Sequence, residues 1–293
     1  MPERSSRIRA QLIVLSAYVL ATFAAGVMLH FIPSLHPITR VAIADTVATA
    51  VVFAFSRAFE NSSVYDPYWS VAPMVIAAYL VFGLNGEAGI SVRKWLALLV
   101  VFVWGARLTF NWIRGWKGFH QEDWRYLQFK PKWGAFYWPL SFLGIHFFPT
   151  VCTFLGCLPL FVITISERPV GWLDLLGAGI ALAGTLIEGT GDEQLRAFRE
   201  DPANKGGICD VGLWHYSRHP NYFGECTFWL GLWVMGYAAA PEAAAWTAIG
   251  VVVIVALFVF YSIPAAEKRS LERRADYAEH QKHVSAFVPW FRK

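Results

Sequence analysis

Charged side chains are scarce in this chain of 293 residues. Asp, Glu, Lys and Arg make up 16% of it, whereas hydrophobic residues make up 56%. A soluble globular domain carries roughly 25% charged residues, so the composition excludes an ordinary water-soluble enzyme. Several apolar runs approach the ~20 residues that are needed to cross the core of a bilayer. The sequence therefore predicts an all-α fold: a polytopic transmembrane helical bundle with short loops, in an integral, multi-pass membrane protein.

Cysteine is also rare. The four cysteines are Cys152, Cys157, Cys209 and Cys226. Cys152 and Cys157 fall in an apolar run, and nothing in the placement of the four cysteines demands a disulfide, so an oxidising compartment is not implied. His215 and His219 are four residues apart, but Pro220 disfavours a shared helix face there. We therefore expect no metal site.

Other signals are missing as well. The chain has no strand-borne Gly-x-Gly-x-x-Gly, which leaves a Rossmann domain unsupported, and it has no internal repeat. The apolar run after Arg4, Arg7 and Arg9 lacks a small-x-small cleavage site, so we interpret it as a retained span rather than a signal peptide. We expect no nucleic-acid partner.

The apolar runs predict about eight spans, within a range of 7–9. They lie near residues 10–32, 41–57, 69–84, 94–112, 136–165, 172–190, 222–240 and 246–264. The fifth is too long for a straight crossing and contains Pro149 and Pro159, so we expect it to tilt, kink or include a re-entrant piece. We treat residues 1–293 as a single membrane-embedded domain.

Lys and Arg are unevenly distributed over the connections. An N-terminus in the cytoplasm places four segments on that side, namely 58–68, 113–135, 191–221 and the tail 265–293. They carry most of the basic residues outside the spans, whereas the opposite connections, near 33–40, 85–93, 166–171 and 241–245, carry Arg40, Arg93 and Arg168. The positive-inside rule therefore predicts that both termini are cytoplasmic, together with the polar motifs in these four segments.

A polar stripe follows the sixth span. Glu188, Asp192, Arg196 and Arg199 are spaced by four, four and three residues. On a continuous helix they fall within about 80° of one another. They are either self-paired surface charges, which contribute little stability, or a site for a phosphate-bearing cofactor, because arginine forks match phosphate oxygens and acids can hold ribose hydroxyls. Arg218 could add to such a site.

A second polar group enters the membrane with the seventh span. Pro220 suits the first turn of a helix, and from there Asn221 and Glu225 share one face. Polar groups at that depth are expensive and are candidates for a functional site. The alternative interpretation is a juxtamembrane anchor.

A third group opens the third span. Asp66 before Pro67 is typical of a helix N-cap, which would lower the pKa of the carboxyl group unless burial raised it. Tyr65 is the alternative proton donor, because a phenol is protonated at neutral pH.

The fourth span and the loop after it carry further candidates. Arg107, Asn111 and Tyr126 either orient a ligand or pair within the membrane interface. If Tyr65 and Asp66 are only an aromatic anchor and a cap, the acid is to be sought near Glu122, Asp123 and Tyr126.

The run from Tyr216 to Glu225 resembles the signature of the steroid 5-alpha-reductase-like membrane reductases, and most closely their bacterial branch, the DUF1295 family. The resemblance covers most of the chain after residue 60 and extends to residues 61–73, 107–129, 188–200 and 267–269. The wider superfamily also includes sterol reductases and isoprenylcysteine carboxyl methyltransferases.

The resemblance implies NADPH-dependent reduction of an activated C=C bond in a lipidic or steroid-like substrate. Tyr65 and Asp66 stand where the steroid enzymes have a Gln-Glu pair that meets the substrate carbonyl. The residues that it implies for the cofactor are Glu188, Asp192, Arg196, Arg199, Tyr216, Arg218, His219, Asn221, Tyr222 and Glu225. Asn221 and Glu225 would meet the nicotinamide end.

Two alternatives belong to other classes. The first is a methyltransferase of the isoprenylcysteine or phospholipid kind that uses S-adenosylmethionine. Because S-adenosylmethionine has no phosphate, the two arginines of the polar stripe favour a dinucleotide instead. The second is a non-catalytic protein that binds membrane lipids. This alternative does not explain why the polar motifs gather on one side of the membrane. The sequence does not indicate an oligomeric state.

Reporter fusions test the expected topology. A reporter placed at Lys293 and another within loop 191–221 should both indicate the cytoplasm, because the basic residues concentrate on that side. A translocated signal at either position would contradict the arrangement of eight spans with both ends inside.

Overall fold

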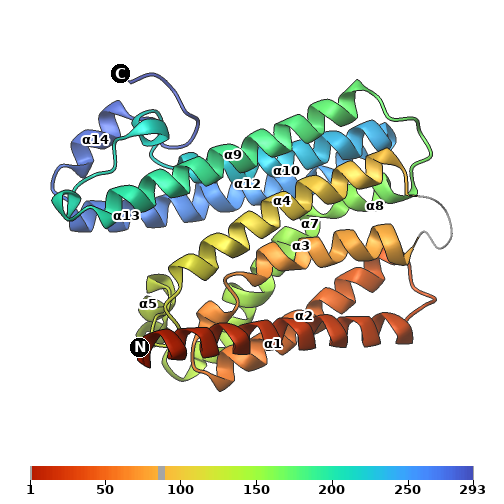
Figure 1. Ribbon diagram of the computed structural model, residues 1–293, viewed down its shortest axis with the longest axis horizontal. Helices are drawn as coiled ribbons and strands as arrows, with labels where there is room; N and C mark the ends of the chain where they lie inside the picture. Colours follow the sequence, from red (N-terminus) through yellow and green to blue (C-terminus); the bar gives the residue numbers. More distant parts are fainter. Residues whose placement is uncertain (1, 85–89, 293) are drawn as a thin grey trace. The chain divides into compact units, whose positions relative to one another are not determined.

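The computed structural model describes residues 2–84 and 90–292 (Figure 1). Within those ranges the chain forms helices and no strand, with one isolated bridge between Ser217 and Ser285. The predicted all-α class is therefore confirmed. The chain divides into two compact units: Met1–Ile90 with Trp104–Thr164, and Ser91–Val103 with Ile165–Lys293. The expected connection 85–93 lies partly outside the described residues.

Unit 1 begins with two long neighbouring helices, α1 (Pro2–Phe31) and α2 (Pro37–Ala58), joined by a short turn. Pro37 lies in the first turn of α2, where its missing N–H costs no hydrogen bond. The unit continues with η1 (Ser62–Val64), α3 (Tyr68–Ala78), the π-helical η2 (Tyr79–Gly83), the second part of α4 (Val92–Gly115) and α5 (Trp124–Trp133). The expected loop 113–135 thus contains a helix, which Asp123 starts by accepting the backbone N–H of Arg125 at 2.8 Å.

The expected fifth span is interrupted. It consists of η3 (Gly134–Phe136), α6 (Tyr137–Ser141), the π-helical η4 (Phe142–Phe147), α7 (Phe148–Gly156) and α8 (Leu158–Ile165). Pro149 lies in the first turn of α7, and Cys157 separates α7 from α8 just before Pro159. Proline removes a backbone donor and clashes with the preceding turn, so these breaks follow from the sequence.

Unit 2 is organised around α9 (Trp172–Glu200) and α10 (Pro220–Ala239), which lie side by side (Figure 1). Its other elements are η5 (Pro202–Asn204), η6 (Gly212–His215), η7 (Pro241–Ala243), α11 (Ala244–Thr247), α12 (Ile249–Leu257), η8 (Phe258–Ser262), α13 (Ile263–Arg273) and α14 (Tyr277–His283).

Glycines set the distance between α9 and α10. A Cβ atom added to Gly184 would lie 2.4 Å from the backbone nitrogen of Phe228, and one added to Gly231 would lie 2.3 Å from that of Ala181. These approaches are closer than any side chain permits, so the two backbones touch. Small residues of this kind are how helices associate closely within a bilayer.

A buried ion pair fixes the N-terminal end of α9, where Asp174 lies in the first turn. Arg93 donates to both carboxylate oxygens of Asp174 at 2.6 and 2.9 Å, and both side chains are nearly inaccessible to solvent. Arg93 also donates to the backbone oxygens of Arg168 and Pro169 at 2.8 and 3.0 Å. This guanidinium therefore fastens the segment before α9 rather than presenting a free charge.

Six helical stretches within the described ranges are long and apolar enough to cross a membrane. They are Ser6–Phe31, Pro37–Ala58, Val92–Gly115, Trp124–Ile165, Trp172–Glu200 and Pro241–Arg273. The expected spans 69–84 and 222–240 are helical as well, but neither is among the six. The protein is integral to a membrane, whereas the count of eight spans and the cytoplasmic termini stay predictions.

Gly184→Ala tests the helix contact. The added methyl group overlaps the backbone of α10, so we expect the free energy of unfolding to fall by about 1–3 kcal/mol. Gly179→Ala, on the same helix, is the control, because nothing lies within 4 Å of its added Cβ; it should raise stability by about 0.5–1 kcal/mol. Thermal melting in detergent measures both. Equal effects of the two substitutions would show that the glycine contact does not limit the packing.

Candidate functional site

In unit 1 a hydrogen-bonded zipper joins the loop before α3 to the loop before α5. The side-chain amide of Asn61 donates to the backbone oxygens of Phe119 and Gln121, each at 2.9 Å. The backbone N–H of Ser62 donates to Glu122 Oε1 at 2.8 Å, and that of Asp123 donates to Ser63 Oγ at 2.9 Å. These four bonds fix the position of the next residues, Tyr65 and Asp66.

Asp66 is not the helix N-cap that its sequence context predicts. Helix α3 begins at Tyr68 with Pro67 as its N-cap and without a side-chain cap. The Asp66 carboxyl group instead accepts the phenolic O–H of Tyr126 at 2.8 Å. Burial, with a smaller contribution from the nearby charge of Asp123, raises its pKa from 3.8 to about 7. A carboxyl group in this state can hold or release a proton at neutral pH.

Tyr65 has a different partner. Its hydroxyl forms a 2.8 Å hydrogen bond with that of Thr150 on α7, and its side chain is only 3% exposed. Burial holds its pKa well above the ordinary value, so the phenol stays protonated. The polar atoms of Asp66 and Tyr65 therefore bond to different elements, Asp66 to α5 and Tyr65 to α7.

The alternative acids near the zipper are engaged in ion pairs. Glu122 is bonded to Lys130, and Asp123 pairs with Arg125 at 2.8 Å. Tyr126, which we expected at the substrate, donates its phenolic O–H to the acid candidate Asp66. Arg107 and Asn111 lie four residues apart on α4, on one helix face and half-buried.

In unit 2 the predicted polar stripe lies on one continuous helix, because α9 runs past the expected end at residue 190 to Glu200. Glu188 is buried, with 5% of its surface exposed, and Arg199 near the helix end is exposed. Arg196 lies 3.8 Å from the carboxylate of Glu193.

Helix α10 brings its polar face against this stripe. Pro220 occupies the first turn as predicted, and the side-chain amide of Asn221 donates to Asp192 Oδ1 at 3.2 Å. Asn221 Oδ1 is buried and has no hydrogen-bond partner within the described part of the chain. Glu225, only 1% exposed, accepts the indole N–H of Trp229 at 2.8 Å. The buried acceptor Asn221 Oδ1 on α10 thus lies beside the carboxylate of Asp192 on α9. The guanidinium groups of the stripe follow farther along α9.

Arg218 is bound by the C-terminal segment. Its guanidinium donates to both carboxylate oxygens of Glu267 at 2.6 and 2.9 Å, and also to the backbone oxygens of Gln281 and Val284. His219 Nε2 lies 3.2 Å from Glu267 Oε1. These contacts show a structural role for Arg218 and His219, and their role at a cofactor stays a prediction.

The two tyrosines of the signature differ in their surroundings. The Tyr222 ring stacks on His219, with 5.3 Å between the ring centroids. Tyr216 is exposed, and its backbone oxygen accepts the N–H of Trp290 at 3.0 Å. Tyr222 thus lies on α10 beside His219, whereas Tyr216 is bound by the C-terminal segment.

The family described as "Protein of unknown function (DUF1295)" matches residues 52–284. The chain belongs to the DUF1295 family. An uncharacterized protein of Schizosaccharomyces pombe is 27% identical over 266 residues, which cover 82% of this chain and 76% of the yeast protein. No solved structure matches the chain significantly. The resemblance to DUF1295 is thus confirmed, and the link to steroid 5-alpha-reductases stays an expectation.

The structure of this DUF1295 protein adds residues that the sequence did not single out. The indole N–H of Trp214 donates to the backbone oxygen of Gly191 at 2.8 Å, and Gln194 Oε1 accepts the N–H of Leu213 at 2.9 Å. Together they dock the segment before the signature onto α9. The sequence carries no periodic signal for these two contacts, because each joins residues of separate elements.

Asp66→Asn tests the raised pKa of this carboxyl group. The folded state keeps the proton up to about pH 7, whereas the unfolded state loses it near its ordinary pKa of 3.8. The stability that Asp66 contributes is therefore present below about pH 4 and is lost as the pH rises through about 7. The parent should lose melting temperature over this range relative to Asp66→Asn. Asp276→Asn, an exposed position on α14's N-cap, should keep the parental slope. Parallel curves for parent and Asp66→Asn would show that the carboxyl group titrates as in the unfolded chain.

Proposed function

We propose that this DUF1295 protein is an NADPH-dependent membrane oxidoreductase that reduces an activated carbon–carbon double bond in a lipidic substrate. The observation that carries the proposal is the group on α9 and α10. It combines the buried acceptor Asn221 Oδ1, the neighbouring carboxylate of Asp192 and, one helical turn along, the guanidinium of Arg196.

The chemistry of this group fits a phosphorylated dinucleotide. Arg196 and Arg199 supply planar forks that match phosphate oxygens. Asp192 can accept hydrogen bonds from ribose hydroxyls, and Asn221 Oδ1 can accept one from the N–H of a carboxamide such as that of nicotinamide. A buried acceptor without a partner is costly, which a donor from the cofactor would offset. Glu188 and Glu225 are buried acids on the same two helices, close in sequence to Asp192 and Asn221.

When bound, NADPH would be the source of a hydride for the β-carbon of an enone-like substrate. The two electrons come with the hydride, and the second hydrogen of the product arrives as a proton. Burial raises the pKa of Asp66 to about 7, so its carboxyl group can hold a proton at neutral pH. It can therefore donate a hydrogen bond to the substrate oxygen on which negative charge develops. Tyr65 is the second candidate donor, and the lipidic substrate would come from the bilayer.

Direct binding to the purified protein tests the proposal. The protein should bind NADPH and should not bind S-adenosylmethionine. Arg199→Ala should weaken NADPH binding about tenfold or more, because a charge-assisted hydrogen bond contributes roughly 1.5–3 kcal/mol. Arg168→Ala makes the same chemical change at an exposed position before the opposite end of α9 and should leave the affinity unchanged.

Three results would overturn the assignment. Binding of S-adenosylmethionine instead of NADPH would indicate a methyltransferase. Binding of neither would favour a non-catalytic lipid-binding protein. An unchanged affinity for NADPH in a folded Arg196→Ala, Arg199→Ala double variant would remove the arginines from the cofactor site.

A further inference from the structure

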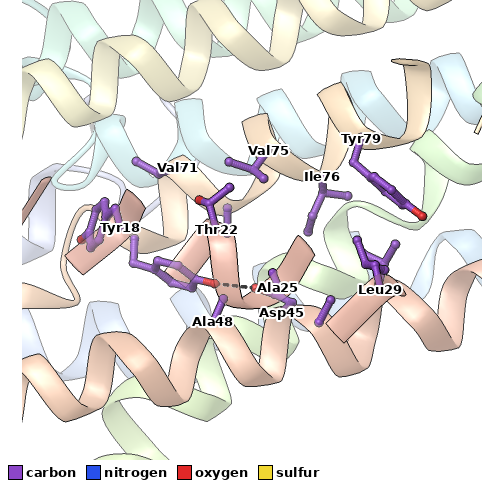
Figure 2. Close-up of a pocket in the computed structure, with 14 residues that line it drawn as sticks. Tyr18, Thr22, Ala25, Leu29, Asp45, Ala48, Val71, Val75, Ile76 and Tyr79 are labelled. Atoms are coloured by element: carbon purple, nitrogen blue, oxygen red, sulfur yellow. Dashed lines mark hydrogen bonds between the residues drawn. The ribbon is translucent and has the colours of Figure 1, made fainter. Parts of the chain in front are cut away.

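A cavity lies between α1, α2 and α3 of unit 1 (Figure 2). Its volume is about 60 Å³, whereas one water molecule needs roughly 10–15 Å³ on the same measure. Its wall is mostly aliphatic, with Tyr18 and Tyr79 at opposite ends in Figure 2. Helix α1 precedes residues 52–284, which match the family, so part of this wall lies outside the family-matched region.

The cavity is elongated along the helices. On α1 the lining residues run from Tyr18 to Leu29, and the eleven residue steps between them span about 16 Å at the helical rise. On α3 and η2 it is lined by Val71, Val75 and Tyr79, which follow one another at single-turn spacing and form a strip along one face. A long, slender apolar body fits a wall of this shape better than a compact one.

One carboxyl group stands in this apolar wall. Asp45 on α2 lines the cavity and is only 6% exposed. Its Oδ1 accepts the phenolic O–H of Tyr68 at 2.8 Å, drawn as the dashed line in Figure 2. Its Oδ2 is buried and has no hydrogen-bond partner within residues 2–84 and 90–292. A buried carboxyl oxygen without a partner costs free energy, and within a membrane span such a group indicates a functional site.

We propose that this cavity binds a long-chain lipid alcohol, whose hydroxyl group pairs with Asp45 while its apolar chain lies along Val71 and Val75. A hydroxyl group both donates and accepts, so it satisfies the Asp45 carboxyl group in either protonation state. An ammonium group only donates and would carry a charge into an apolar wall. Rotation about the Cβ–Cγ bond of aspartate is soft, so a small turn of the carboxyl group brings Oδ2 to the ligand.

Photocrosslinking in nanodiscs tests this site with the full chain. The probe is a 14-carbon primary alcohol that carries a diazirine in mid-chain, and mass spectrometry locates the labelled residues. We expect labels on the segments 18–29 and 71–79. Unlabelled tetradecanol should compete at least tenfold better than tetradecane or tetradecylamine. No NADPH and no turnover are needed, so the outcome is independent of the proposed reductase activity.

Substitutions separate the polar from the apolar part of the site. Asp45→Leu should weaken probe binding about tenfold, equivalent to about 1.4 kcal/mol, whereas Asp45→Asn keeps a donor and an acceptor and should stay within threefold of the parent. Ala25→Phe fills the cavity from α1 and should abolish labelling. The matched control is Gly26→Phe, because nothing lies within 4 Å of a Cβ atom at that position. Melting curves confirm that each variant is folded.

The proposal fails on any of three results. Equal competition by tetradecane would show that the carboxyl group plays no part. Better competition by tetradecylamine would assign the site to an amine. Labelling that persists in Ala25→Phe, or that maps outside the two segments, would place the probe elsewhere on the protein. If Asp45→Leu does not fold, the Ala25→Phe and Gly26→Phe pair and the competition series decide the question.

Discussion

The backbone contact between α9 and α10 is the constraint on which the polar group of unit 2 depends. Gly184 and Gly231 permit the approach, and Gly224 leaves no room for a side chain against Glu188, whose nitrogen would lie 2.5 Å from an added Cβ. Bulkier residues at these positions would separate the helices by the thickness of a methyl group or more. The 3.2 Å hydrogen bond between Asn221 and Asp192 could then not form. Packing of small residues thus determines where the candidate cofactor-binding atoms lie.

Unit 1 holds two carboxyl groups, those of Asp66 and Asp45, within a mostly apolar interior. Asp66 obtains a partner from α5 through the zipper between two loops, and its environment leaves a titratable proton. Asp45 obtains one partner from α3 and leaves its second oxygen buried without one. Both arrangements cost stability relative to an apolar core. A structure that retains two such groups is consistent with selection for binding or chemistry.

Local signals explain why some features could be predicted from the sequence and others could not. Composition predicted the helical membrane fold, and the prolines predicted that the fifth span is not a straight helix. The spacing from Glu188 to Arg199 predicted a stripe on one helix face. Each of these predictions depends only on residues that lie near one another in the chain. Asp66 failed as a cap because its hydrogen bond with Tyr126 on α5, 60 residues away, competes with the helix end. The partner of Arg218, Glu267, lies 49 residues away and has no periodic signal. Asp45 was not among the predicted site residues, although it is the one acid in the apolar run 41–57.

The C-terminal segment has a consequence for how the chain is made. Ser285 pairs with Ser217, and the backbone N–H of Arg218 donates to Ser285 at 2.9 Å, so the signature is completed by residues near the end of the chain. Synthesis proceeds from the N-terminus at about 5–20 residues per second. The guanidinium of Arg218 therefore emerges seconds before the backbone carbonyls that bind it. During that interval the nascent chain holds an unneutralised charge beside a membrane-entering helix, and water or the insertion machinery must solvate it until residues 267–284 have been synthesised.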